Sequence, residues 1–83
     1  MINDMSIDDV IIDYINKETD HTIPMEMLRT ASFAEMGLDS EKVIFLTGEL
    51  SDRFDIDIDP TIVFEYSDVT SLARYIEKLL GSR

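Results

Sequence analysis

The chain of 83 residues contains no cysteine, and its 18 acidic and 7 basic residues give a formal net charge of −11. The length predicts a single domain, residues 1–83, and the lack of cysteine excludes disulfides, thiolate metal sites and a cysteine nucleophile. The charge disfavours binding to nucleic-acid phosphates and anionic lipid headgroups, and it favours partner proteins with basic surfaces.

The sequence also lacks the patterns that direct a chain to or across a membrane. No apolar run approaches the roughly 20 residues needed to cross a bilayer. The acidic start, MINDMSIDD, lacks the basic and apolar regions of a signal peptide. We therefore expect a cytoplasmic protein without membrane insertion.

The first helix is predicted to start at Ser6, whose side chain can cap it, and to end near residues 17–20. Asp8 and Asp9 in its first turn suit the positive end of the helix dipole. Apolar residues recur with helical spacing and should face the core: Ile7, Val10, Ile11, Tyr14 and Ile15.

Residues 19–39 are predicted to form a long connection, because Pro24 bars a regular helix and Gly37 marks the end of the segment. A connection of this length in so small a domain usually has some structure or function of its own. Its apolar residues predict that it lies against the core: Ile23, Met27, Leu28, Phe33, Met36 and Leu38.

The second helix is predicted over residues 40–54, with Asp39 as its N-cap and Ser40 at its first position. At about 100° per residue, one side of this helix is largely apolar, and Phe45 projects from the opposite, otherwise acidic side. The predicted inward residues are Val43, Leu46, Thr47, Leu50 and Phe54.

The remaining sequence predicts a loop, a short helix or turn, and a final helix. DIDIDP, residues 55–60, is interpreted as a loop that turns Ile56 and Ile58 inward, and TIVFEY as the short helix or turn. The final helix should start near Thr70, its expected cap, and stop at Gly81. The predicted fold class is therefore an all-α bundle of three main helices and one short helix, with a long first loop.

Neither a serine nucleophile nor a calcium site fits the sequence. A nucleophilic serine needs a base, and the only histidine, His21, lies in the first connection, where we interpret it as a solvated loop residue. The acidic residues of DIDIDP match the start of an EF-hand loop, but Pro60 and Tyr66 stand where glycine and glutamate are required. The run is therefore interpreted as a solvated acidic loop, and no metal site is expected.

Ser40 has two interpretations. A serine near a helix start is common and usually structural. Because Asp39 already fits as the cap, however, the Ser40 hydroxyl should point to solvent beside the positive end of the helix. Free backbone N–H groups and the helix dipole would favour a phosphodiester there. Ser40 is therefore a candidate attachment point for a phosphate-linked group.

Two segments of the chain carry a family likeness. FAEMGLDS, residues 33–40, is similar to the phosphopantetheine attachment motif of acyl carrier proteins. PTIVFEYSDVTSLARYI, residues 60–76, is similar to the closing segment of carrier domains from modular polyketide synthases. The order of helix, long loop, serine-headed helix, short helix and final helix is also that of the family. The resemblance extends over residues 6–80 and implies an acyl-carrier-like bundle.

The resemblance implies that Ser40, preceded by Asp39, accepts 4′-phosphopantetheine from a phosphopantetheinyl transferase. The chain would then be a non-catalytic monomer that holds acyl or polyketide intermediates as thioesters, since the reactive sulfur belongs to the cofactor. Its other partners would be a ketosynthase, an acyltransferase or further acyl-modifying enzymes with basic patches. In the family, such partners contact the second helix and the loop before it, which here comprise Leu38, Asp39, Glu41, Lys42, Phe45 and Glu49.

Two residues depart from the family pattern. Glu41 stands where the family usually has leucine, and Phe45 stands where many relatives carry a polar residue. Phe45 either supplies an apolar partner contact or packs under the first loop. The alternatives are a fatty-acid carrier, whose motif more often reads DSL, a peptidyl carrier, which usually has glycine before the serine, and an acidic helical adaptor without a prosthetic group.

Overall fold

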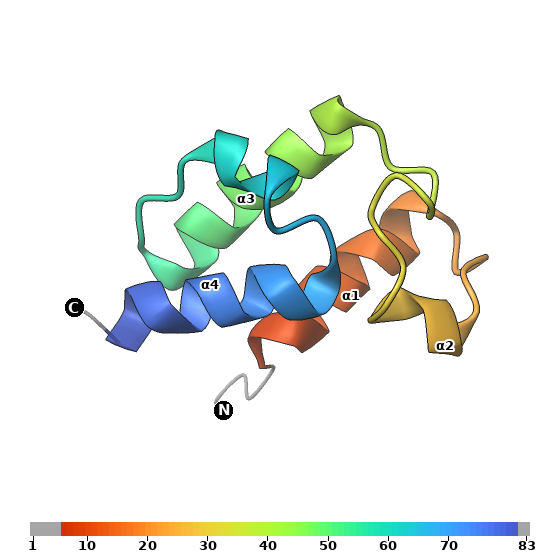
Figure 1. Ribbon diagram of the computed structural model, residues 1–83, viewed down its shortest axis with the longest axis horizontal. Helices are drawn as coiled ribbons and strands as arrows, with labels where there is room; N and C mark the ends of the chain where they lie inside the picture. Colours follow the sequence, from red (N-terminus) through yellow and green to blue (C-terminus); the bar gives the residue numbers. More distant parts are fainter. Residues whose placement is uncertain (1–5, 82–83) are drawn as a thin grey trace.

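The structure, a computed structural model, describes residues 6–81. The elements in this part of the chain (Figure 1) are α1 (Ile7–Glu18), α2 (Met25–Leu28), α3 (Ser40–Phe54), the 3₁₀ helix η1 (Pro60–Phe64) and α4 (Val69–Gly81). Residues 6–81 contain no strand, and their only extended pairing is an isolated antiparallel bridge between Ser32 and Asp68. The fold is therefore the expected all-α bundle, with the four-residue α2 as an addition inside the first connection.

Side-chain caps fix the starts of the first two long helices. The Ser6 hydroxyl accepts a hydrogen bond from the Asp9 N–H at 3.4 Å. The Asp39 carboxylate accepts one from the Lys42 N–H at 3.0 Å. Each cap satisfies an amide that has no partner within its own helix. The predicted starts of α1 and α3 are therefore confirmed.

The predicted cap of α4 is wrong. Asp68, and not Thr70, accepts a hydrogen bond from the Ser71 N–H, at 2.8 Å. Thr70 lies inside the first turn, where its hydroxyl donates to the carbonyl oxygen of Arg29 at 3.1 Å. The Thr70 hydroxyl is thus engaged by the backbone of the first connection, and Asp68, two residues earlier, caps α4.

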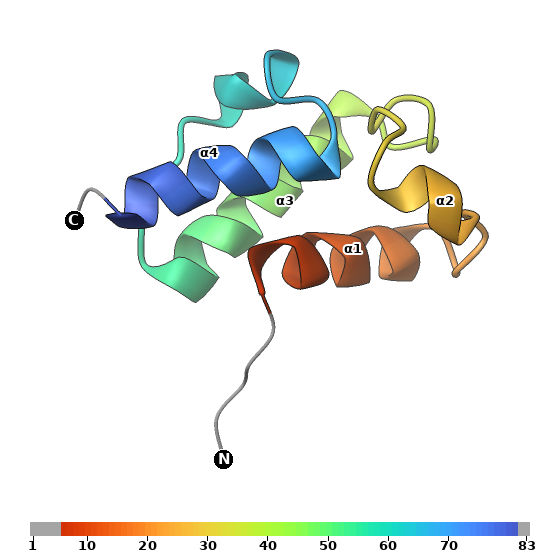
Figure 2. The same cartoon turned by 60° about the horizontal axis from the view of Figure 1, so that its bottom comes forward.

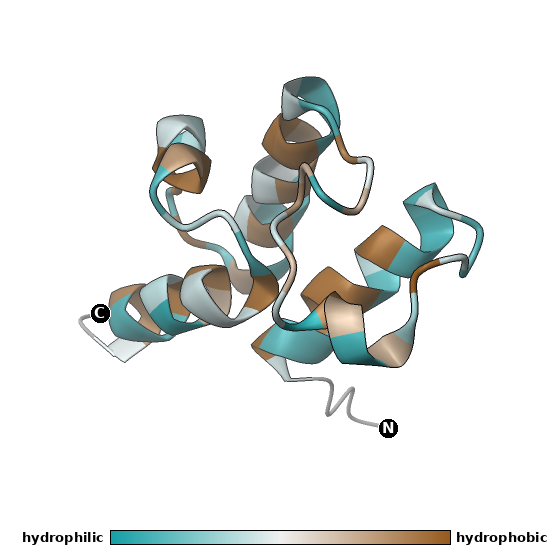
Figure 3. Ribbon diagram, turned by 45° about the vertical axis from the view of Figure 1, so that its right-hand side comes forward, coloured by the Kyte–Doolittle hydropathy of each residue, from teal (hydrophilic) through white to brown (hydrophobic). Residues whose placement is uncertain are grey.

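The long helices turn their apolar sides inward. α1 packs against α4, and α3 packs against η1 (Figure 2). In Figure 3 the hydrophobic residues are concentrated on the sides of the helices that face one another. The largest fully buried side chains are Ile11, Ile15, Leu46, Leu50, Val69, Leu72 and Ile76. Each contributes about 1.5–3 kcal/mol relative to an exposed position. None of the helices in residues 6–81 combines the length and the apolar character that a bilayer-spanning helix requires.

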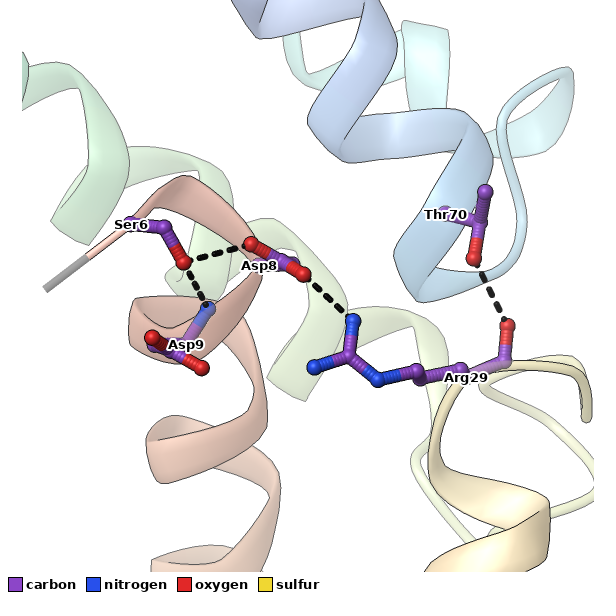
Figure 4. A network of polar contacts seen from close by, with 5 residues as sticks. All are labelled: Ser6, Asp8, Asp9, Arg29 and Thr70. Carbon is purple, nitrogen blue, oxygen red and sulfur yellow. Dashed lines mark hydrogen bonds and ion pairs between the residues drawn. The ribbon is translucent and has the colours of Figure 1, made fainter.

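The long connection between α1 and α3 is bonded to α1 and to the start of α4. The Phe33 N–H donates to the Ser67 carbonyl oxygen at 2.8 Å. The Arg29 guanidinium pairs with the Asp8 carboxylate in the first turn of α1, and Figure 4 shows this pair beside the Thr70 hydrogen bond. Four of the six apolar residues predicted to lie against the core are buried, and two are partly buried. The buried ones are Leu28, Phe33, Met36 and Leu38.

Candidate functional site

Ser40 is the first residue of α3, and its side chain is exposed. The Asp39 carboxylate satisfies the Lys42 N–H, and the Asp39 carbonyl oxygen accepts from the Val43 N–H at 3.1 Å. Among residues 6–81 the Ser40 hydroxyl has no hydrogen-bond partner. The structure therefore presents an unengaged hydroxyl at the positive end of a 15-residue helix.

An apolar recess with a volume of about 180 Å³ lies beside Ser40. Three parts of the chain form its walls: the end of the first connection, the first turn of α3, and η1 with the segment that follows it. None of the wall residues carries an ionisable side chain. They are Phe33, Ala34, Leu38, Ser40, Val43, Val63, Phe64 and Ser67.

Helix α1 holds the first turn of α3 in place. The Tyr14 hydroxyl donates to the Lys42 carbonyl oxygen at 2.8 Å, and the Lys42 ammonium lies 3.4 Å from the Glu18 carboxylate. Burial raises the pKa of Tyr14, and the nearby charges of Glu18, Glu49 and Asp39 raise it further. The tyrosine therefore remains a protonated donor at neutral pH, and the start of α3 is anchored to α1.

The structure separates the expected contact residues into an exposed group and a buried one. Glu41, Phe45 and Glu49 are exposed on α3, and Phe45 keeps 64% of its surface accessible. Phe45 thus points outward and does not pack under the first connection. Leu38 is only 3% exposed and belongs to the core, so the expectation that it faces a partner does not agree with this structure. Its loop position carries no helical phase from which burial could have been predicted.

Two further exposed apolar residues, both on α3 or η1, were not identified from the sequence. Phe64, in η1, is 71% exposed, and it lines the recess beside Ser40. Ile44, one helical turn after Ser40, is 44% exposed. Helical phase places Ile44 between the inward and outward sides of α3, and the short η1 has too few residues to establish a phase for Phe64. Neither exposure had a clear signal in the sequence.

The recess contains no group that could activate Ser40. His21 is exposed in the first connection and is not among the residues that line the recess. Nucleophilic attack by a serine requires a base that takes its proton. Within residues 6–81, none of the side chains that line the recess is a base that could take the proton of the Ser40 hydroxyl.

Within the described residues, the small all-α bundle thus presents an exposed hydroxyl without a hydrogen-bond partner at the start of α3. The sequence model of the family described as "Phosphopantetheine attachment site" matches residues 11–76, which is most of the chain. The chain belongs to this family. It is an acyl-carrier-type protein, and the cofactor of its family is covalently attached 4′-phosphopantetheine. No solved structure gave a significant match to the chain.

Proposed function

We propose that Ser40 is the attachment residue and that the chain carries polyketide intermediates. The observation that carries the first part is the division of roles at the start of α3: Asp39 makes the cap, and the exposed Ser40 hydroxyl makes no hydrogen bond within the described residues. When attached, the cofactor would supply a terminal thiol that holds an acyl group as a thioester.

The surroundings of Ser40 fit a phosphodiester. The N–H groups of Ser40 and Glu41 belong to the first turn of α3 and have no acceptor within the helix. Together with the helix dipole, such groups stabilise a negative charge by about 0.3–1 kcal/mol at an exposed site. The carboxylates of Asp39 and Glu41 oppose this effect, but both residues are exposed, and water and salt screen their repulsion.

The reaction requires a separate transferase. The Ser40 oxygen would form the new bond to the phosphorus of coenzyme A, and the nucleotide part would leave. Because the recess offers no base, the proton of Ser40 must pass to a group on the transferase, which would also supply magnesium.

We propose that partner enzymes bind the outward side of α3. Glu41 and Glu49 place two carboxylates there, and Phe45 places an exposed ring between them. A partner with lysine or arginine around an apolar pocket would complement this surface. The proposed partners are the transferase, a ketosynthase, an acyltransferase and other acyl-modifying enzymes, and the net charge of −11 would speed their encounter with a basic surface.

The polyketide assignment rests on the sequence of residues 60–76 and on the motif GLDS at Ser40. Glu41 follows Ser40 where many fatty-acid carriers have the leucine of DSL, and Asp39 stands where peptidyl carriers usually have glycine. We further propose a cytoplasmic location, where coenzyme A and the partner enzymes would be available.

Mass spectrometry tests the attachment site. After incubation with coenzyme A and a broad-specificity phosphopantetheinyl transferase, the protein should gain the mass of one phosphopantetheine. Ser40→Ala should gain nothing, whereas Ser67→Ala, which alters another exposed serine of the same recess, should be modified like the wild type. Modification of Ser40→Ala, or none of the folded wild type, would contradict the proposal.

The same measurement on protein from its native host tests the pathway. A polyketide carrier should bear ketide or extender acyl groups on the arm. Aminoacyl groups would instead indicate a peptidyl carrier, and saturated long chains would indicate a fatty-acid carrier.

A further inference from the structure

Most of the large exposed hydrophobic side chains among the described residues lie on the two elements that surround Ser40. Phe45 and Ile44 belong to α3, and Phe64 belongs to η1, which packs against α3. The other one, Met25, is 85% exposed on α2. Single exposed apolar residues are common, but a group of them on adjoining elements is typical of an interaction surface.

Phe64 is not needed for the core. Its neighbour Val63 is 5% exposed and Ile62 packs partly against the core, so these two residues attach η1 to the bundle. Phe64 points the other way and keeps 71% of its surface accessible. The ring nevertheless forms part of the wall of the recess that contains Ser40. Phe64 is therefore an exposed apolar residue of the same recess as Ser40, and most of its surface is not buried in the core.

Any enzyme that acts on Ser40 has to cover this region. Bond formation requires the reacting atoms to approach within about 3–3.5 Å, in a site from which bulk water is excluded. Since Ser40 and Phe64 line the same recess of about 180 Å³, an enzyme seated over the Ser40 oxygen also reaches the Phe64 ring.

We propose that Phe64 is a recognition residue for the phosphopantetheinyl transferase and extends the partner surface from α3 onto η1. This inference rests on the proposed attachment at Ser40. The partner would offer an apolar pocket for the ring, bordered by basic side chains. Charge complementarity supports this chemistry, because the exposed Glu65 follows Phe64, and the exposed Asp39 and Glu41 flank Ser40.

Steady-state kinetics of the modification reaction test the proposal. Initial rates with coenzyme A and the transferase are measured against carrier concentration for the wild type, Phe64→Ala, Phe64→Leu and Met25→Ala. Met25→Ala is the matched control, because it truncates an even more exposed apolar side chain that does not line the recess. Phe64→Leu retains apolar volume at the test position.

Phe64→Ala should raise KM for the carrier about tenfold, which corresponds to about 1.4 kcal/mol, and change kcat by less than about twofold, since only binding is lost. Phe64→Leu should recover most of the affinity, and Met25→Ala should behave like the wild type. Equal kcat/KM values for Phe64→Ala, Met25→Ala and the wild type would overturn the proposal.

Two controls keep the outcome unambiguous. If Phe64→Ala lowers the melting temperature, Phe64→Gln becomes the test variant. It keeps a long side chain without its apolar character and should raise KM in the same way. If the wild type is never modified, or if Ser40→Ala is still modified, the attachment proposal itself fails. If the wild type is modified at Ser40 and the Phe64 variants match it in rate, only the role of Phe64 is rejected.

Discussion

Phe45 and Leu46 are adjacent in α3 but occupy opposite environments. Phe45 is 64% exposed, whereas Leu46 is fully buried in the core. Because successive helical residues differ by about 100°, adjacent side chains can serve different purposes, one facing solvent and the other stabilising the bundle. The core contact and the proposed partner contact therefore belong to different residues in this part of the helix.

The first prediction at this scale concerns Phe45. Phe45→Ala should slow modification by the transferase, because it removes the apolar centre of the proposed partner surface, and should leave the melting temperature almost unchanged. Leu46→Ala serves as the comparison, since truncating a buried leucine costs about 2–5 kcal/mol. Circular dichroism melting and initial rates measure the two effects. A fall in melting temperature for Phe45→Ala close to that of Leu46→Ala would show that the ring is structural.

At the scale of elements, α3 contains a glycine that lowers its helical stability. Gly48 lies in the middle of this helix and is exposed, and apart from its chain neighbours and the nearby backbone of its own helix no heavy atom lies within 4 Å of the position a Cβ would take. The structure therefore gives no packing reason for glycine at this position. Glycine in a helix interior costs about 0.5–1 kcal/mol relative to alanine, because it loses more conformational freedom on folding.

Gly48→Ala should therefore raise the free energy of unfolding by about 0.5–1 kcal/mol, which urea denaturation can measure. Gly37→Ala is the matched control. It also has open space around its Cβ position, but its φ of +85° is strained for any residue with a side chain, so this variant should be destabilised. Equal effects of the two substitutions would contradict the explanation based on backbone conformation.

The elements differ in how far their sequences determine them. The starts of α1 and α3 could be predicted because Ser6 and Asp39 cap their helices through contacts three residues away. The cap of α4 also acts three residues away, from Asp68 to the Ser71 N–H, but the sequence offers both Asp68 and Thr70 for this position. The contact that engages Thr70 comes from Arg29, far away in the sequence, and no local pattern shows it.

The candidate site shows the same division between local and distant contacts. The position of Ser40 at a helix start and the outward direction of Phe45 follow from helical phase. The burial of Leu38 and the place of Phe64 beside Ser40 depend on how the first connection and η1 pack against α3. Such packing brings together residues that are distant in the chain, and a local pattern does not contain it.

For the molecule as a whole, the 18 acidic residues create self-repulsion that decreases as the pH falls. Asp8 works in the opposite direction. Hydrogen bonding from Ser6 and the adjacent Arg29 guanidinium lower the pKa of Asp8 below its usual value. Because its pKa is lowered in the folded state, Asp8 stabilises the fold at pH values above the ordinary pKa of aspartate. This contribution is lost as the pH falls through the lowered pKa.

Asp8→Asn should therefore be slightly less stable than the wild type at pH 7, and the difference should vanish at a pH below the folded-state value. The effect should be small, because partly exposed ion pairs contribute little. Urea denaturation gives the free energy of unfolding of both proteins at each pH. The repulsion among the acidic residues that both proteins share cancels when the two values are subtracted. Added salt should also reduce the difference at pH 7. A difference that is constant across this pH range would rule out the ionised carboxylate as its cause.

The cap at the start of α3 has a consequence for competition between copies of this protein. Because Asp39, and not Ser40, satisfies the Lys42 N–H, replacing Ser40 removes the proposed attachment hydroxyl without removing the cap. Phe45, Glu49 and the rest of the outward side of α3 would keep their positions. If the proposed attachment and partner surface are right, a chain changed only at Ser40 would act as a competitive inhibitor: it would occupy the enzymes that recognise the carrier while taking no acyl group from them.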